Sequence, residues 1–126
     1  MNLWAVEIKN LGRFEGEVEK DVVERSVKLF AIGADETLIM IFGIIPLSLL
    51  ARTGFIWVYL PPEGKAASRV VWRSFFRVWP EFYTKIGWDL IAFTKNDWAT
   101  AVRFMRFFGF EPFQEKGDVT LYRRIG

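Results

Sequence analysis

The sequence predicts an α/β (α+β) fold in which a mixed, mostly antiparallel and twisted sheet is flanked by helices. Short apolar runs typical of strands are interleaved with segments whose apolar residues recur at helical spacing. Glycine and proline stand at the boundaries between these segments. The resulting order is strand, helix, hairpin, central strand, helix, strand, helix and hairpin, and right-handed crossovers should place the later helices against the sheet.

The length and composition fit one domain over residues 1–126 with a single core. The chain has 126 residues, of which 52% are hydrophobic and 25% charged. Aromatic residues reach 17%, which is more than an interior of this size usually absorbs. We therefore expect an exposed aromatic surface that meets a ligand or a protein partner, with a homo-oligomer as one form of such a contact.

Two residue types are missing from the sequence, and their absence limits the chemistry. There is no cysteine and no histidine, which excludes disulfides, thiol nucleophiles, zinc-finger spacings and histidine triads. We expect no metal site. Any catalytic acid or base must be a carboxylate, a tyrosine, a lysine, an α-amine or water.

The net charge of +2 is unevenly spread. Residues 1–50 carry 5 Lys/Arg and 8 Asp/Glu, whereas residues 51–126 carry 12 and 7. The C-terminal part could attract an anion, although a charge this small is also ordinary for a protein surface. Glu7 and Lys9 interrupt the start before an apolar region forms, and the longest apolar run, residues 38–51, is shorter than the roughly 20 residues of a membrane span. We expect a soluble, cytoplasmic chain that binds no membrane.

The first half of the chain predicts a strand, a helix and a hairpin. "LWAVEI", residues 3–8, alternates loosely and indicates a strand. Residues 16–28 carry valines at helical spacing and predict a short amphipathic helix. Two apolar runs around the polar "ADE" predict a hairpin over residues 27–45, which Pro46 should end.

The second half predicts a central strand and two helices. "GFIWVYLPP" indicates a strand over residues 55–60 that is buried on both faces. The helix after it should reach Trp79, where Pro80 stops or kinks it, with a core face made of Val70, Val71, Phe75, Phe76 and Val78.

"WDLIAFTK" follows as a further buried strand. Asn96 or Asp97 should cap a helix over residues 98–108, which Gly109 ends in a left-handed conformation with Phe110 folding back on the last turn. The turn at Lys116-Gly117-Asp118 predicts a second hairpin at the edge of the sheet.

The segment "PPEGKAASR" is the best candidate for a ligand site. A glycine with small residues before a helix lets main-chain N–H groups approach a phosphate, although such a cluster is more often a plain connection. Arg69, Arg73 and Arg77 are spaced four apart and form either a basic stripe or an ordinary solvated face. Lys65 and Arg69 lie nearest to the helix start and are the expected anion contacts.

We expect no nucleic-acid binding. Arginines interleave with aromatic residues on this helix, but the spacing places Trp72, Phe75, Phe76 and Trp79 on faces that a sheet would bury. Aromatic rings that stack on bases must be exposed.

The central strand, the glycine-containing turn into a helix, the next strand and the helix ending in "FFGFEP" together resemble the acyl-CoA-binding core of the GNAT (general-control-type N-acetyltransferase) superfamily. In that family the closing helix ends in a Leu-Gly-Phe signature, and Phe108, Gly109 and Phe110 stand in those places. The hairpin "KLFAIGADETLIMIFGIIP" is similar to the family's second and third strands. "GFIWVYLPPEG" and "AVRFMRFFGFEP" look closest to short, divergent GNAT-like proteins encoded by tailed bacteriophages. The resemblance covers most of the chain after residue 27.

The resemblance implies that acetyl-CoA is the cofactor. It would be held by the main chain of the central strand and by a pyrophosphate loop, through Val58, Leu60, Gly64, Lys65, Ala66 and Arg69. The family's loop reads Arg or Gln, two residues, Gly, one residue, then Gly or Ala. Gly64 and Ala66 fit this pattern, but Pro61 occupies its first place and removes one donor.

The resemblance also implies a reaction. An acceptor amine attacks the thioester carbonyl, main-chain N–H groups of the central strand bind the developing oxyanion, and a carboxylate acting through water takes the amine proton. Glu63 is the candidate base, with a plain surface glutamate as the alternative. Many family members use a tyrosine four residues before the signature glycine as the acid, but that place holds Met105, which cannot transfer a proton. Tyr59 is the candidate replacement, unless it is a core or rim aromatic.

Two functions stay open at this point. The first is a CoA-dependent N-acetyltransferase acting on a small amine or a protein amine. The second is a GNAT-like phage protein that has lost catalysis and serves as a binding, virion-assembly or host-interaction component, located in a host cytoplasm or a virion. Residues 64–66 favour the first, whereas Met105 and the surplus of aromatic residues favour the second.

Overall fold

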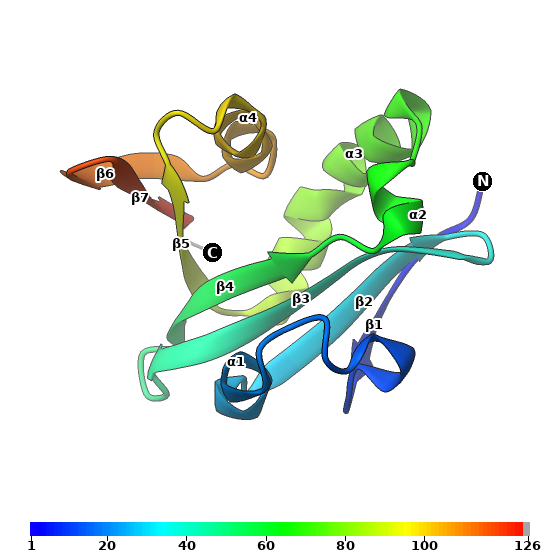
Figure 1. Cartoon of the computed structure of the whole chain (residues 1–126), viewed down its shortest axis with the longest axis horizontal. Helices are drawn as coiled ribbons and strands as arrows, with labels where there is room; N and C mark the ends of the chain where they lie inside the picture. Colours follow the sequence, from blue (N-terminus) through cyan, green and yellow to red (C-terminus); the bar gives the residue numbers. More distant parts are fainter. Residues whose placement is uncertain (125–126) are drawn as a thin grey trace. The chain divides into compact units, whose positions relative to one another are not determined.

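The computed structural model describes residues 1–124 and has a mixed α+β architecture (Figure 1). The strands of the described residues form a mostly antiparallel sheet in the order β1-β2-β3-β4-β5-β7-β6, flanked by helices, which confirms the predicted fold class. The strands are β1 (Leu3–Ile8), β2 (Lys28–Ala34), β3 (Thr37–Ser48), β4 (Thr53–Tyr59), β5 (Asp89–Lys95), β6 (Glu111–Lys116) and β7 (Val119–Arg124). The helices are the short η1 (Gly12–Phe14), α1 (Lys20–Arg25), α2 (Pro62–Lys65), α3 (Arg69–Ile86) and α4 (Ala99–Phe107).

The chain divides into two compact units. The first holds Met1–Pro46 and Ile56–Phe75, and the second holds Leu47–Phe55 and Phe76–Gly126. β4 and α3 each pass from one unit into the other, so the chain crosses this boundary inside continuous secondary structure.

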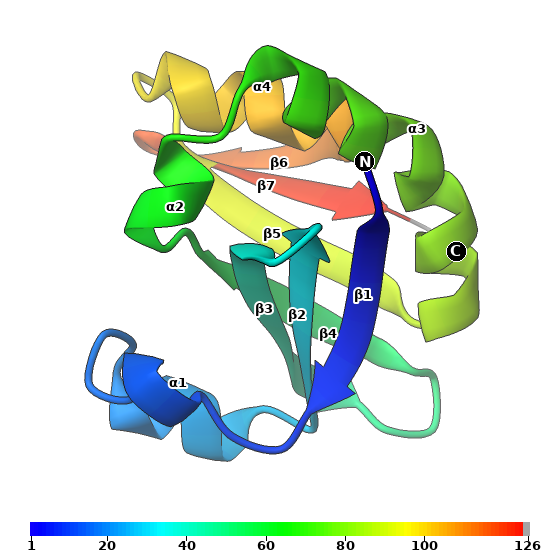
Figure 2. The same ribbon diagram turned by 90° about the vertical axis from the view of Figure 1, so that its right-hand side faces the viewer.

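The first unit is built on the predicted hairpin. β2 pairs antiparallel with β3 on one side and with β1 on the other, and Figure 2 shows β1 running alongside them. The hairpin supplies a block of buried apolar side chains that includes Ile32, Ile39, Met40, Ile41, Phe42 and Ile44. A run of apolar residues without polar alternation is expected where a strand is covered on both faces.

Two glycines of this hairpin leave room for tryptophan rings. A Cβ on Gly33 would lie 2.0 Å from Cζ2 of Trp4, and a Cβ on Gly43 would lie 2.4 Å from Cζ2 of Trp57. The indole N–H of Trp57 donates to Oγ of Ser26 (2.7 Å) at the end of α1. The indole of Trp57 therefore ties α1 to β4.

Two predictions for the first unit are wrong at their boundaries. The helix expected over residues 16–28 is confined to α1, because Gly16 has a φ of 92°, which an α-helix does not use. β3 runs through Pro46 to Ser48 instead of ending before the proline. The last β2 partner of β3 is Ile44, so Pro46 lies beyond that ladder, and its missing N–H costs no bond to β2.

β4 differs from the doubly buried strand that its sequence predicts. It spans residues 53–59 rather than 55–60, and most of its side chains are half-buried, with Val58 39% exposed. Its parallel ladder with β5 ends at the pair Phe55 and Ile91. Residues 56–59 extend beyond that pair. They therefore lack the neighbouring β5 strand that lies beside residues 53–55.

Tyr83 joins three elements of the second unit. Its hydroxyl accepts a hydrogen bond from the N–H of Leu90 on β5 (3.1 Å) and donates to the carbonyl oxygen of Arg124 on β7. The Arg124 guanidinium lies 4.5 Å from the centre of the Tyr83 ring. Burial raises the pKa of Tyr83 to about 12. A neutral phenol at this position therefore locks α3, β5 and β7 together.

α3 is longer than predicted and buries a different face. It continues through Pro80 to Ile86, and its buried side chains in the described structure are Phe75, Trp79, Tyr83 and Ile86. Val70 and Val78, which were expected in the core, are 63% and 42% exposed. Each residue turns a helix by about 100°, so Val78 leaves the face of its neighbour Trp79.

The predicted end of α4 is confirmed. Gly109 has a φ of 78°, its N–H donates to the carbonyl of Arg106 (3.0 Å), and the N–H of Phe110 donates to the carbonyl of Met105 (2.9 Å). This pair of bonds is the Schellman motif, and the buried Phe110 follows it.

The predicted start of α4 is wrong. The residue before the helix is Trp98, with no side-chain cap, and the Asn96 amide instead accepts a hydrogen bond from the hydroxyl of Thr120 on β7. The side-chain N–H of Asn96 also donates to the carbonyl of Gly117 (3.5 Å). That glycine belongs to the predicted turn between β6 and β7, and β6 is the predicted edge strand.

Candidate functional site

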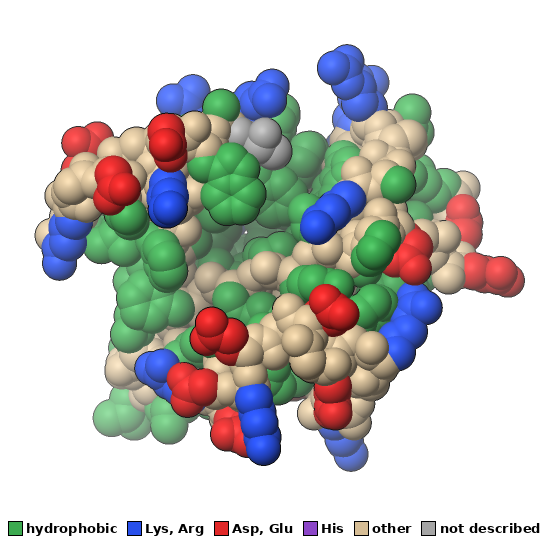
Figure 3. All heavy atoms as spheres, in the orientation of Figure 1, with side chains coloured by type: hydrophobic (Ala, Val, Ile, Leu, Met, Phe, Trp, Pro, Cys, Tyr) green, Lys and Arg blue, Asp and Glu red, His purple; other side chains and the backbone are tan. Residues whose placement is uncertain are grey.

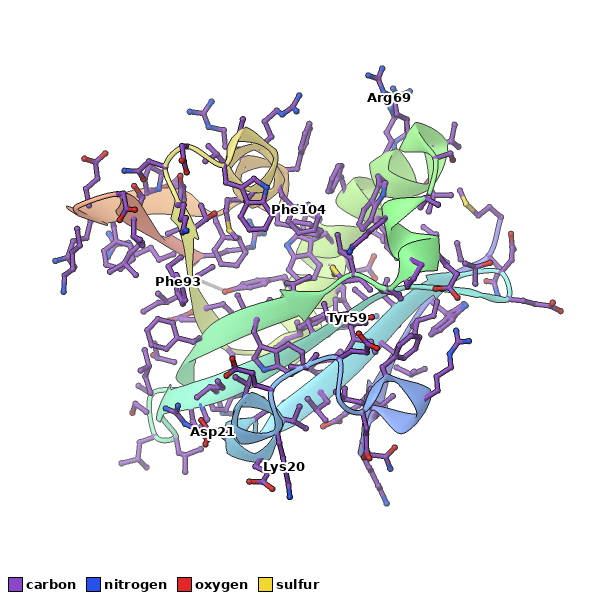
Figure 4. All side chains as sticks on the ribbon, viewed as in Figure 1. Lys20, Asp21, Tyr59, Arg69, Phe93 and Phe104 are labelled. Carbon is purple, nitrogen blue, oxygen red and sulfur yellow. The ribbon has the colours of Figure 1, made fainter. Side chains whose placement is uncertain are left out.

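The sequence-predicted site residues lie in the first unit, at the end of β4 and the start of α3. Val58 and Tyr59 are the last two residues of β4, Leu60 and Pro61 connect the strand to α2, and Glu63 to Ala66 form that single helical turn and its end. Figure 4 shows Tyr59 at the end of β4, close to α2.

Gly64 packs its main chain directly against β3. It is buried, and a Cβ on it would lie 1.9 Å from the carbonyl oxygen of Ile39. No side chain fits in that space without moving one of the two backbones. The glycine therefore allows α2 to dock on the hairpin, which is a role in packing.

The N–H groups of the predicted phosphate loop are already used. Those of Gly64 and Lys65 donate to the carbonyl of Pro61 (2.9 and 3.0 Å), and that of Ala66 donates to the carbonyl of Pro62 (3.0 Å). A phosphate could recruit them only by breaking this turn. The loop of residues 64–66 is therefore closed on itself rather than open to an anion.

The first turn of α3 offers a better anion contact. Oγ of Ser68 accepts a hydrogen bond from the N–H of Val71 (3.4 Å), and the carbonyl of Ser68 accepts one from the N–H of Trp72 (3.2 Å). Helix geometry leaves the N–H groups of Arg69 and Val70 without intrahelical partners. The dipole of this 18-residue helix adds partial positive charge at the same end.

Basic side chains lie at this helix start and further along α3, and they are exposed to solvent. Lys65, Arg69, Arg73 and Arg77 are all exposed, and Figure 4 shows Arg69 directed away from β4. The three arginines form the predicted stripe along α3. Their exposure means that Arg69 could meet a flexible anionic group but does not face Tyr59.

Tyr59 lies in a small cluster that the sequence did not reveal. Its ring contacts the ring of Phe14 in η1 (centres 5.7 Å apart), and the Arg13 guanidinium lies 4.6 Å from the centre of the Phe14 ring. The pKa of Tyr59 is raised above its ordinary value, mainly by partial burial and less by the nearby carboxylates of Glu17 and Glu63. The positive charge of Arg13 acts in the opposite direction. Tyr59 therefore keeps its proton at neutral pH.

Glu63 is held by an ion pair. Its Oε1 lies 3.3 Å from Nη2 of Arg13, and both side chains are largely exposed. The pair joins residues 50 positions apart in the chain. No pattern in the sequence connects them, so only the folded chain could place η1 beside α2.

Acidic side chains follow the same segment. Glu15, Glu17, Glu19, Asp21 and Glu24 are exposed, and Figure 3 shows acidic side chains over α1 and the turn before it. Lys20 pairs with Glu24 and Arg25 pairs with Asp21, each four residues apart on α1. Of the carboxylates in this part of the chain, those of Glu17 and Glu63 act on Tyr59, and Arg13 opposes them.

The second unit carries a separate depression of about 590 Å³, which the sequence did not predict. It lies at the end of β5 and is lined by Phe93, Thr94, Lys95, Asp97, Trp98 and Val119. Phe93 and Trp98 are 64% and 61% exposed, which agrees with the expected surplus of surface aromatic residues. Met105, in the place of the family's catalytic tyrosine, is half-buried in α4.

The described residues hold neither a cluster suited to a metal ion nor a helix suited to a membrane. No group of three or more potential metal-ligating side chains occurs in residues 1–124. None of the helices in that part of the chain is long and apolar enough to cross a membrane.

Comparisons with known proteins give similarity in structure only. No model of a protein family matches the chain, and no curated protein matches its sequence. Among solved structures, a GNAT family acetyltransferase from Elizabethkingia anophelis with acetyl-CoA bound is 12% identical, with a TM-score of 0.64 over 97% of each chain. The N-acetyltransferase PseH of Campylobacter jejuni in complex with acetyl coenzyme A is 11% identical, with a TM-score of 0.66 over 98% of each chain.

A third similar structure is the spermidine/spermine N-acetyltransferase SpeG of Vibrio cholerae, at 14% identity and a TM-score of 0.65 over 97% of this chain and 91% of that one. All three similarities extend over nearly the whole of this chain, at sequence identities at which only the fold is shared. The chain therefore has the fold of the GNAT acetyltransferases.

Proposed function

We propose that the chain is an N-acetyltransferase that binds acetyl-CoA and transfers its acetyl group to an amine by direct attack. The observation that carries this proposal is the junction of β4 and α3. The last residues of β4 are not paired with β5, and the helix that follows has N–H groups without intrahelical partners at its start. Acetyl-CoA is bound in two of the similar structures, PseH and the Elizabethkingia protein.

The residues of this chain suit the pyrophosphate of acetyl-CoA at the first turn of α3. The N–H groups of Arg69 and Val70 are free in a helix of this geometry, whereas those of residues 64–66 are bonded within α2. Lys65 and Arg69 add positive charge at the same end. The main chain of Val58 and Leu60 would hold the rest of the molecule, in the part of the chain that lies beyond the β5 ladder.

Acetyl-CoA would supply an acetyl group activated as a thioester. Glu63, exposed to water and paired with Arg13, is the proposed base that takes a proton from the acceptor amine through water. Tyr59 is the proposed acid, because it carries a phenol proton at neutral pH and ends β4 next to the segment that holds Glu63. A C–N bond forms as the C–S bond breaks, one proton passes to Glu63 and another leaves Tyr59. The main-chain N–H groups of β4 stabilise the charge on the carbonyl oxygen.

The carboxylates of Glu17 and Glu63 beside Tyr59 suit a cationic acceptor such as a polyamine or a lysine side chain. SpeG is named a spermidine/spermine N-acetyltransferase, and we therefore choose spermidine as the first acceptor to test. The acceptor itself stays a prediction, as do a single domain over residues 1–126 and a cytoplasmic location.

Titration calorimetry with acetyl-CoA tests the proposal. We expect micromolar binding to the unaltered chain, and Arg69→Glu should weaken it by about tenfold because a charge beside the pyrophosphate is reversed. Arg77→Glu is the matched control, since it reverses another exposed charge two turns further along α3 and should leave binding nearly unchanged. Absence of heat at millimolar acetyl-CoA would remove the proposal.

A second function is favoured by Met105. A GNAT-like protein without turnover, serving as a binding, virion-assembly or host-interaction component, needs no acid at that position, and the exposed Phe93 and Trp98 suit a protein contact. Thiol release from acetyl-CoA with spermidine or a lysine peptide separates the two: binding without release supports the second function. The phage source implied by the resemblance stays a prediction.

A further inference from the structure

β1 is an edge strand, and the N–H and C=O groups on its outer side pair with no other strand of the sheet described in residues 1–124. The N–H of Asp35 donates to the carbonyl of Asn2 (2.7 Å), and the antiparallel register pairs Leu3 with Ala34 through to Ile8 with Leu29. Hydrogen-bonded pairs alternate along such a ladder. Residues 4, 6 and 8 therefore bond to β2, while residues 3, 5 and 7 direct their N–H and C=O groups outward.

Apart from one glutamate, this edge lacks the usual protection against pairing. β1 contains no proline, lysine, glycine or bulge, and its one charged residue, Glu7, is 3.9 Å from Nζ of Lys28. Val6 is 48% exposed. The opposite edge, β6, contains Pro112, Lys116 and a break in register. Natural sheets use those devices to prevent edge-to-edge association, so their absence at β1 marks it as an edge that another strand can join.

We propose that β1 pairs antiparallel with β1 of a second copy of this chain, about a two-fold axis at Ala5. In this register Ala5 faces Ala5 of the other copy, and residues 3 and 7 face each other in the same hydrogen-bonded pattern. All outward groups of residues 3, 5 and 7 then find partners. The two sheets become one continuous sheet across the axis.

The side chains of β1 favour a second copy as the occupant. Trp4 of one copy lies beside Val6 of the other, which is an apolar pair on adjacent strands, and this happens twice. Ala5 is the smallest side chain of the strand and sits at the axis. Each Glu7 faces Leu3 rather than the other Glu7, whereas parallel pairing in register would bring the two carboxylates together. The charge pattern thus selects the antiparallel arrangement.

The strand start is already ordered for such pairing. The N–H of Asn2 donates to Oδ1 of Asp35 (2.8 Å), and the indole N–H of Trp4 donates to the carbonyl of Asp35 (2.7 Å). The dimer therefore costs little ordering of the chain. A contact between two short strands is small, so we expect a dissociation constant in the micromolar range rather than a permanent dimer.

Sedimentation equilibrium over a range of concentrations tests the pairing. The unaltered chain should change from monomer to dimer, and Ala5→Lys, which places two like charges at the axis, should raise the dissociation constant about tenfold or more. Glu115→Lys places a lysine on the exposed β6 edge and should leave the dissociation constant unchanged. A chain that stays monomeric at about 1 mM, or an Ala5→Lys variant that dimerises as before, overturns the proposal.

A cross-linking experiment tests the register independently. The sequence has no cysteine, so Ala5→Cys introduces a single thiol. Hydrogen-bonded partners on antiparallel strands have Cα atoms about 5.5 Å apart, within the span of a disulfide. Mild oxidation should give a covalent dimer from Ala5→Cys and none from Glu115→Cys. Equal cross-linking of both variants would indicate random collision and contradict the proposed axis.

Discussion

At the residue scale, three glycines of the first unit permit close approaches that a Cβ would block. Gly64, Gly33 and Gly43 each face a backbone or an indole ring at a distance that excludes a Cβ. From the sequence, Gly64 was expected to serve phosphate binding, because a glycine before a helix looks the same whether a ligand or a neighbouring strand approaches it. Only the position of β3 distinguishes the two.

Gly64→Ala should destabilise the chain strongly. The new methyl group would meet the carbonyl oxygen of Ile39, and overpacking of this kind costs about 1–3 kcal/mol. Gly117→Ala is the control, since its φ of 61° is unfavourable for alanine but nothing lies within 4 Å, and it should cost about 1 kcal/mol. Urea unfolding of both variants gives the comparison, and equal losses would show that α2 can move away from β3.

Because of Tyr83, the free energy of unfolding should decrease as the pH becomes alkaline. Its folded pKa of about 12 lies above the ordinary value of 10.0, so the folded state resists ionisation. The contribution is complete below about pH 10 and is lost as the pH rises toward 12, with a slope of up to about 1.4 kcal/mol per pH unit. Tyr83→Phe should lack this part of the slope and lose about 1–3 kcal/mol at pH 7, because the N–H of Leu90 loses a partner. Parallel slopes for the two proteins in urea titrations between pH 9 and 12 would contradict the assignment.

At the element scale, α3 shows how packing overrides a local signal. A proline inside a helix removes one main-chain bond and usually ends the helix, which is why an end near Trp79 was expected. The buried residues Tyr83 and Ile86 lie beyond the proline and hold the last turns in place. At the start of α4, tertiary structure again overrides the local signal. The side-chain oxygen of Asn96 accepts a hydrogen bond from Thr120 and is therefore not available as a helix cap.

Pro80→Ala should therefore stabilise the protein. Pro80 is exposed, and alanine restores an N–H to the helix interior, a change worth about 1–3 kcal/mol after the loss of proline rigidity in the unfolded chain. Glu81→Ala is the neighbouring control and should change stability by less than about 0.5 kcal/mol, since it removes only an exposed pair with Lys85. Thermal unfolding followed by circular dichroism measures both, and a lower melting temperature for Pro80→Ala would show that the proline shapes a necessary bend.

At the scale of the whole molecule, the sequence predicted the strand order along the chain, the two hairpins and the glycine that ends α4. These features depend on residues near one another in sequence, such as Gly109 with Phe110, or Gly117 with Asp118. The half-buried state of β4 could not be predicted. An apolar strand has the same sequence pattern whether the neighbouring strand pairs with three of its residues or with all seven. The cluster of Arg13, Phe14 and Tyr59 was also hidden, since it joins segments far apart in the chain.

Unfolding of the whole chain should be a single transition. β4 and α3 each belong to both compact units, so melting of one unit breaks a strand and a helix of the other. Differential scanning calorimetry should give a calorimetric enthalpy equal to the van't Hoff enthalpy. Two resolved peaks would contradict the expectation of one domain over residues 1–126.

The rings that cover Gly33 and Gly43 also constrain how relatives of this chain can vary. A larger residue at either glycine becomes acceptable only after Trp4 or Trp57 is replaced by something smaller, so the two positions of each couple should change together during evolution. A natural relative that keeps tryptophan at position 57 while carrying valine at position 43 would require a main chain displaced from the one described here.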